Sequence, residues 1–148
     1  MSSERTFTLG EAQALLPVLS DLMQTAMRAQ RQVEAMDQEM QALISRILLS
    51  GGIQVDPLHT GRLKSERERA NQQVEDAVRE IGASGAQVKD LDLGLLDFPY
   101  LLSGRLVLLC WKLGEPLIEH WHGVDEGYAN RKPLDPSMYR SDSSPRIH

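Results

Sequence analysis

The sequence predicts an α+β protein in which a long N-terminal antiparallel helical hairpin, similar to a coiled coil, packs on a small C-terminal antiparallel β-sheet. Three observations predict this fold class. A heptad pattern of apolar residues fills the first third of the chain, a shorter one follows a segment with Gly and Pro, and short apolar runs between turn residues occupy the last third. We assign residues 1–85 to the hairpin, residues 86–134 to the sheet and its following loop in the same folding unit, and residues 135–148 to a polar C-terminal tail.

The first helix is expected from Leu9 to Leu49. Thr8 and Glu11 have the spacing at which each side chain bonds the free backbone N–H of the other, which favours a helix start. Pro17 has no N–H to donate, so we expect a bend that steers the first turns onto the sheet. The apolar positions alternate steps of three and four residues without a gap: Ala12, Leu15, Leu19, Leu22, Ala26, Ala29, Val33, Met36, Met40, Leu43 and Ile47.

The second helix is expected from about Leu63 to Ile81, after a loop that begins at residues 50–52 and contains Pro57 and Gly61. The short connection makes it antiparallel to the distal part of the first helix. This helix is the shorter of the two, which leaves the start of the first helix free to pack on the sheet. Close approach of the two axes is favoured by small residues at facing positions, namely Ala26, Ala29, Ala70 and Ala77.

Composition places the chain among globular proteins of one folding unit. It has 148 residues, 41% of them apolar, and a net charge of −5 with acidic and basic residues mixed, so nucleic acid is not an expected partner. No apolar run approaches the length needed to span a bilayer, and the N-terminus lacks the pattern of a signal peptide. The single Cys cannot form an internal disulfide. A cytoplasmic location without membrane contact is therefore predicted.

The last third of the chain predicts a three-stranded antiparallel meander. Its expected strands are Leu93–Phe98, Leu106–Leu113 and Leu117–His122. The turn residues at 103–104 and 114–116 separate them. Alternation along the third strand places Ile118, His120 and His122 on one face, and Leu117, Glu119 and Trp121 on the other.

One face of this sheet is predicted to gather metal-ligand types. A three-residue turn at 114–116 pairs Leu113 with Leu117, which brings Cys110 opposite His120 on the face that also carries His122. Such S and N ligands suit a divalent metal such as zinc, and Asp97 or Glu115 would complete the set. The alternative is structural, because a single Cys in a strand is commonly a small buried apolar residue and a His-Trp-His edge commonly flanks a core Trp.

Arg131 lies in the loop that follows the strands, together with Tyr128, and both are expected to fold back over the sheet. The planar guanidinium of Arg131 suits a carboxylate or a phosphate. The sequence leaves open whether Arg131 forms a salt bridge with Asp97 or Glu115 or binds an anionic ligand.

The motifs of this region, GLLDFP, GR-x-V-x-LCWKLGEP, WH and GY-x-x-RKPL, occur in order, and FTLGEAQALLP opens the chain at Phe7. In these motifs the sequence resembles the uncharacterised family known as domain of unknown function 2203, over nearly the whole chain to about Leu134. The resemblance implies no established activity. His120 and Leu117 depart from the residue types expected there. The types that do correspond are those of Asp97, Cys110, Trp111, Glu115, Trp121, His122 and Arg131.

Three functions are compatible with the sequence. The favoured one is a cytoplasmic structural or protein-interaction module that forms a homodimer through its helices, because Met23, Met27 and Ile44 flank the heptad pattern and need cover. The alternative is a metal- or anion-binding protein, with hydrolysis as one use of the site, in which the ligand residues are Asp97, Glu115, His122 and Arg131. A third function, a small-ligand sensor, would use an apolar pocket formed by Trp111, Trp121 and Tyr128.

Overall fold

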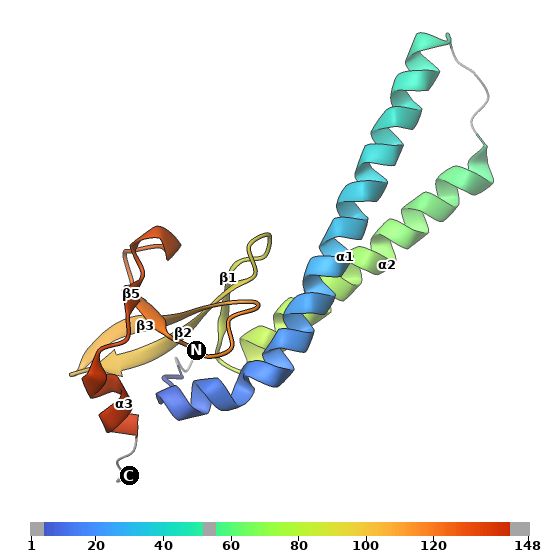
Figure 1. Ribbon diagram of the computed structural model, residues 1–148. Coiled ribbons are helices and arrows are strands. Elements are labelled where there is room, and N and C mark those ends of the chain that lie inside the picture. Colours follow the sequence, from blue (N-terminus) through green and yellow to red (C-terminus); the bar gives the residue numbers. More distant parts are fainter. Residues whose placement is uncertain (1–4, 52–55, 143–148) are drawn as a thin grey trace.

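The structure, a computed structural model, describes residues 5–51 and 56–142, and it has the predicted α+β fold (Figure 1). A long helical hairpin projects from a body formed by a five-stranded antiparallel sheet. In chain order the elements are α1 (Leu9–Leu49), α2 (Pro57–Ala83), β1 (Gln87–Asp90), β2 (Leu95–Leu102), β3 (Arg105–Lys112), β4 (His120–Gly123), the 3-10 helix η1 (Tyr128–Asn130), β5 (Lys132–Pro133) and α3 (Pro136–Asp142).

Helix α1 has the predicted bounds, and the predicted reciprocal cap defines its start. The Thr8 hydroxyl accepts a hydrogen bond from the Glu11 N–H at 3.0 Å, and the Glu11 carboxylate accepts one from the Thr8 N–H at 2.8 Å. The axis of α1 changes direction within its dark blue first part, and Pro17 lies in this part of the helix (Figure 1). The first turns therefore lie along the sheet, while the rest of α1 runs outward beside α2.

Helix α2 begins at Pro57, six residues before the predicted start at Leu63. The sequence predicts a loop at Pro57, but Pro57 occupies the first turn of the helix, where its missing N–H has no helical partner to lose. The Asp56 carboxylate caps this end by accepting a hydrogen bond from the Leu58 N–H at 3.1 Å. The predicted helix stop at 50–52 is described only as far as Gly51.

The sheet is a simple meander in which each strand pairs with the next one along the chain, in the order β1-β2-β3-β4-β5. The three predicted strands are present with shifted ends, and β1 and β5 were not predicted. Strand β1 has four residues with a polar sequence, and β5 has only two, so neither carries a clear apolar alternation. The two-residue turn between β2 and β3 uses Ser103 at φ 53° and Gly104 at φ 81°, which matches the twist of the flanking strands.

One face of the sheet packs against the start of α1, and we call it the helix-facing side. Phe7 ties the chain start to this body, because its N–H donates to the Pro99 carbonyl at 2.8 Å and its ring contacts that of Phe98 edge-on at 5.4 Å. The core contains apolar side chains from α1, the end of α2 and the central strands: Leu9, Ala12, Leu16, Leu19, Met23, Ile81, Leu96, Phe98, Tyr100, Val107, Leu109 and Trp111.

The predicted polar tail is not wholly a tail. Pro136–Asp142 forms the helix α3, and Met138 on this helix is completely buried in the core. Met138 and Tyr139 are adjacent in an otherwise polar helix, so the sequence had no periodic signal for this contact. The rest of the predicted tail, residues 143–148, lies outside the described residues.

None of the helices in the described part of the chain has both the length and the apolar character needed to cross a bilayer.

Candidate functional site

The face of the sheet opposite α1, which we call the outer face, carries most of the predicted site residues. Cys110 pairs with His120 in the β3–β4 register, as predicted. The three-residue turn assumed at 114–116 is wrong, because β3 ends at Lys112 and β4 begins at His120, so residues 113–119 connect the two strands. On the other side of β3, Asp97 of β2 pairs with Cys110. The prediction for Ile118 is wrong: β4 begins only at His120, and Ile118 is buried in the helix-facing core.

Asp97 and His122 form a buried pair on this face. The Asp97 carboxylate lies 3.1 Å from Nε2 of His122, and the two side chains are 2% and 0% exposed. The other ring nitrogen, Nδ1, lies 2.8 Å from the Gly123 carbonyl, which can only accept, so Nδ1 carries a proton. Burial raises the pKa of Asp97, and the charge and hydrogen bond of His122 oppose this shift. The pair is therefore held together by one proton between the carboxylate and Nε2.

Cys110 lies between this pair and a second group of polar side chains. Its thiol is completely buried, and the ligand atoms of Asp97, Cys110 and His122 all lie within 4.8 Å of one another. Burial raises the pKa of the Cys110 thiol to about 11, with the charge of Asp97 adding to the shift and Arg131 opposing it. The thiol is thus in its protonated form at neutral pH.

Arg131 forms a two-pronged ion pair with Glu115, which is one of the two partners that the sequence offered. Its guanidinium nitrogens lie 3.1 and 2.7 Å from the two carboxylate oxygens. Burial raises the pKa of Glu115, but the hydrogen bonds from Arg131 and the Lys112 N–H outweigh this and hold the pKa below its usual range. Tyr128 stacks beneath Arg131, with the guanidinium 4.4 Å from the ring centre. Arg131 therefore has a structural partner already.

The remaining predicted residues are divided between the two faces. Trp111 is 2% exposed, belongs to the helix-facing core and donates its indole N–H to the Glu115 carbonyl at 2.9 Å. Trp121 packs against the same core under Lys132, whereas Tyr128 lies with Arg131. The aromatic pocket proposed for a small-ligand sensor is therefore not formed by these three residues together.

Two contacts that hold the site in place correspond to no motif in the sequence, so the sequence did not predict them. The Gly123 carbonyl fixes the His122 ring, and the Glu126 carboxylate holds the same turn by accepting hydrogen bonds from the Gly123 N–H at 2.7 Å and from Lys132 at 2.6 Å. Every residue has a backbone carbonyl, so residue type does not indicate that the Gly123 carbonyl accepts a hydrogen bond from His122. The spacing of three residues from Gly123 to Glu126 is the one signal that was available.

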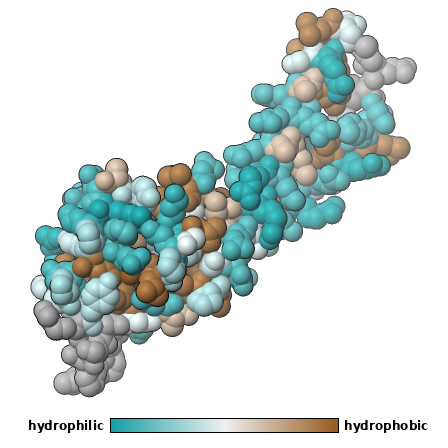
Figure 2. All heavy atoms as spheres, viewed as in Figure 1, coloured by the Kyte–Doolittle hydropathy of each residue, from teal (hydrophilic) through white to brown (hydrophobic). Residues whose placement is uncertain are grey.

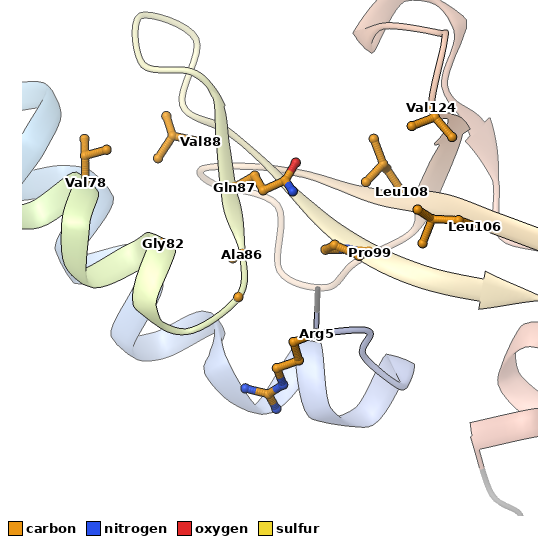
Figure 3. Close-up of a pocket in the computed structure, with 11 residues that line it drawn as sticks. Arg5, Val78, Gly82, Ala86, Gln87, Val88, Pro99, Leu106, Leu108 and Val124 are labelled. Carbon is orange, nitrogen blue, oxygen red and sulfur yellow. The ribbon is translucent and has the colours of Figure 1, made fainter. Parts of the chain in front are cut away.

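A hollow of about 500 Å³ lies on the outer side of β1, β2 and β3, next to the end of α2 (Figure 3). Leu108 lines it and is the register partner of His122, so the hollow adjoins the buried pair, but Asp97, Cys110 and His122 are not among the described residues that line it. Its wall is largely apolar. Its charged residue, Arg5, donates to the Ser84 carbonyl at 2.9 Å and lies over the Phe7 ring. The described residues that line the hollow thus bring no cluster of polar side chains together.

Together these features define an α+β protein with a projecting helical hairpin and a buried Asp–His–Cys group on the outer face of its sheet. The chain belongs to the family of uncharacterised conserved proteins DUF2203, whose model matches residues 5–134. The resemblance in the sequence motifs is thereby confirmed. Neither the curated proteins nor the solved structures contain a match to this chain.

Proposed function

We propose that this protein is a cytoplasmic structural or interaction module whose helical hairpin associates with the hairpin of a second copy. We call the apolar positions of α1 that are spaced three and four residues apart the heptad seam. The observation that carries the proposal is that the side chains of this seam become more exposed to solvent with distance from the sheet. A seam of this kind is stable in water only where another helix covers it.

The seam is well covered near the sheet and poorly covered beyond it. In the first part of α1, Ala12, Leu19 and Ala26 are at most 1% exposed. Farther out the same pattern continues without a break, yet its members are only half-buried between α1 and α2. These half-buried members are Met36, Met40, Leu43 and Ile47. The distal hairpin therefore presents apolar surface that two helices alone do not cover.

The end of the hairpin adds further apolar surface. Leu48 is 76% exposed, Leu49 is 88% exposed and Leu58 is 78% exposed. Figure 2 shows this surface as brown spheres at the far end of the hairpin. Large apolar side chains gathered at one exposed place commonly mark an interaction site.

Charge favours a second copy as the partner. The α1 segment 34–39 carries three carboxylates and no basic residue, whereas the α2 segment 62–69 carries four basic side chains and two carboxylates. Within one hairpin Arg67 of α2 already pairs with Asp37 of α1. In a two-fold dimer, where each helix of one hairpin meets the other helix of the second hairpin, the remaining two carboxylates of the α1 segment and three basic side chains of the α2 segment attract one another. The result is a four-helix bundle that encloses the distal seam.

The test is the molar mass in solution, measured by sedimentation velocity over a wide concentration range. The wild-type protein is expected to be dimeric, and the variant Met40→Glu/Leu43→Glu is expected to be monomeric with unchanged near-ultraviolet circular dichroism. Ser45→Glu, an exposed position on the opposite side of α1, is the matched control and should remain dimeric. A wild-type protein that stays monomeric at the highest concentration contradicts the proposal.

A further inference from the structure

The buried group on the outer face combines three different metal-ligand types. Asp97, Cys110 and His122 come from three adjacent strands, β2, β3 and β4, whose registers fix their backbone positions. Their ligand atoms lie within 4.8 Å of one another. Ligand atoms around a tetrahedral zinc ion are separated by roughly 3.5 Å, as follows from bond lengths of about 2.0 to 2.3 Å. Small side-chain rotations therefore suffice to bring the three atoms onto one ion.

The His122 ring is oriented as the ring of a metal ligand is. Its Nδ1–H donates to the Gly123 carbonyl, which leaves Nε2 as the nitrogen directed toward Asp97. Metal-ligating histidines commonly donate their second N–H to a carbonyl or a carboxylate, because this fixes both the tautomer and the ring. An ion would replace the single proton that now joins Nε2 to the carboxylate.

The charges of the three residues match a divalent ion. An aspartate and a cysteine thiolate carry two negative charges and a neutral imidazole carries none, so the set with a divalent cation is electrically neutral. All three side chains are at most 2% exposed, and a neutral group costs far less to bury than a charged one. The positive charge of Arg131 does not change this neutrality, because Arg131 forms an ion pair with Glu115.

A fourth ligand is available on the same face. His120 is the register partner of Cys110, and its Nδ1 is buried without a hydrogen-bond partner among the residues that the structure describes. An unsatisfied buried ring nitrogen is costly and calls for an explanation. His120 lies outside the group of three, so a side-chain rotation would be needed to bring it to the ion.

From this geometry we propose that Asp97, Cys110 and His122 form a closed, structural site for a divalent zinc-like ion, with His120 as the fourth ligand. Mixed S and N ligands select zinc or cobalt over magnesium and calcium, which prefer oxygen ligands. The burial of all three residues favours a structural site, since catalytic zinc sites keep a position open to water or substrate. The site is independent of the proposed self-association of the hairpin.

The experiment uses tag-free full-length protein titrated with Co²⁺, a spectroscopic substitute for zinc, and followed by absorption. We expect saturation near one equivalent, visible bands of tetrahedral cobalt and a near-ultraviolet band of thiolate-to-cobalt charge transfer. Cys110→Ser should abolish the charge-transfer band, and Asp97→Asn should weaken binding by at least tenfold. Elemental analysis of the isolated wild-type protein should show zinc at close to one ion per chain.

His59→Ala is the matched control, because His59 is an exposed histidine on α2 beside Glu39, at 3.6 Å, and should not affect cobalt binding. Circular dichroism checks that each variant is folded, and the result for the wild type does not depend on any variant. Wild-type protein that takes up neither cobalt nor zinc at one equivalent overturns the proposal. So does a cobalt spectrum without a thiolate band, or one that is lost in His59→Ala.

Discussion

At the residue scale, Glu115 connects three parts of the sheet and its surrounding loops. Its carboxylate accepts hydrogen bonds from the Lys112 N–H at 2.8 Å and from Arg131, and its backbone carbonyl accepts one from the Trp111 indole. One residue in the turn after β3 thus holds the strand end, a core Trp and the loop that carries Arg131. Because the Glu115 and Arg131 side chains are only 21% and 15% exposed, solvent screens their interaction only in part.

Replacing Glu115 should destabilise the protein in a pH-dependent way. We expect Glu115→Gln to lower the free energy of unfolding at pH 7 by about 2 kcal/mol, the usual contribution of hydrogen bonds to a charged group. The folded pKa of Glu115 lies below its usual value, so its contribution is complete above the unfolded pKa of about 4.3 and is lost as the pH falls through the folded pKa.

Urea unfolding between roughly pH 3 and pH 7 checks this expectation. The difference between wild type and Glu115→Gln should be largest above roughly pH 5 and should shrink below roughly pH 4. Glu119→Gln, at an exposed position nearby, is the control and should change stability little at any pH. A difference that does not vary with pH would contradict the assigned ion pair.

Cys110 should react slowly with a thiol reagent in metal-free folded protein. Burial raises its pKa to about 11, about two pH units above the ordinary thiol value, so the reactive thiolate is depleted by roughly two orders of magnitude, and burial slows access further. The measurement is the rate of colour release from an aromatic disulfide at pH 8, with and without denaturant. Equal rates under the two conditions would show that the thiol is accessible in the folded protein.

At the element scale, α1 is attached to the sheet by a polar contact as well as by its apolar face. The Gln13 side-chain carbonyl accepts a hydrogen bond from the Ile118 N–H at 2.8 Å, across 105 residues of sequence. Ile118 is 1% exposed, so this N–H is remote from water. The contact fixes the segment between β3 and β4 against the first turns of α1.

Gln13→Leu should therefore cost about 1 to 3 kcal/mol in unfolding free energy, the penalty for leaving a buried donor unsatisfied. Thermal or chemical unfolding measures this change. Gln24→Leu, on an exposed part of α1, should have an effect within about 0.5 kcal/mol. Equal losses in the two variants would mean that the Gln13 contact contributes nothing specific.

The elements that sequence predicted well are those with local determinants. The Thr8–Glu11 cap marked the start of α1. A turn centred on Glu115 gave the pairing of Cys110 with His120, although the connection between the two strands is longer than the predicted three residues. The early start of α2 was missed because Pro57 is compatible with a loop and with a first helical turn alike. Strand β1 was not predicted because its four-residue polar sequence has no clear apolar alternation. Helix α3 was not predicted because its place depends on the core around Met138, which is built from residues distant in sequence.

The candidate site likewise has some features that local sequence determines and others that depend on distant parts of the chain. The shared face of Cys110, His120 and His122 could be predicted from alternation and from a turn centred on Glu115. The pairing of Asp97 with Cys110 is also set locally, by the two-residue turn at Ser103 and Gly104. The choice of Glu115 over Asp97 by Arg131 is not set by local sequence, because it depends on how the segment between β4 and β5 returns over the sheet.

At the scale of the whole molecule, local stability should decrease from the sheet toward the end of the hairpin. Central strand residues such as Leu109 are completely buried, whereas Leu49 and Leu58 at the far end are largely exposed. Opening a segment with few buried apolar contacts costs little free energy. We expect backbone amides of the distal hairpin to exchange with deuterium much faster than those of β2 and β3.

Hydrogen exchange followed by mass spectrometry measures this gradient directly. If the hairpins associate as proposed, protection of the distal segments should rise with protein concentration, while protection of the sheet stays constant. The Met40→Glu/Leu43→Glu variant supplies the control, since its distal protection should not depend on concentration. Uniform protection along α1 at low concentration would contradict the gradient.

The start of the chain packs on strands that are synthesised much later, as the hydrogen bond from the Phe7 N–H to the Pro99 carbonyl illustrates. The apolar surface at the start of α1 is covered by β2 and β3, which lie more than 80 residues later in the sequence. During synthesis on the ribosome, the first turns of α1 therefore emerge long before the residues that bury them exist. At about 5 to 20 residues per second, this surface stays uncovered for several seconds or longer, the interval in which a chaperone could bind it.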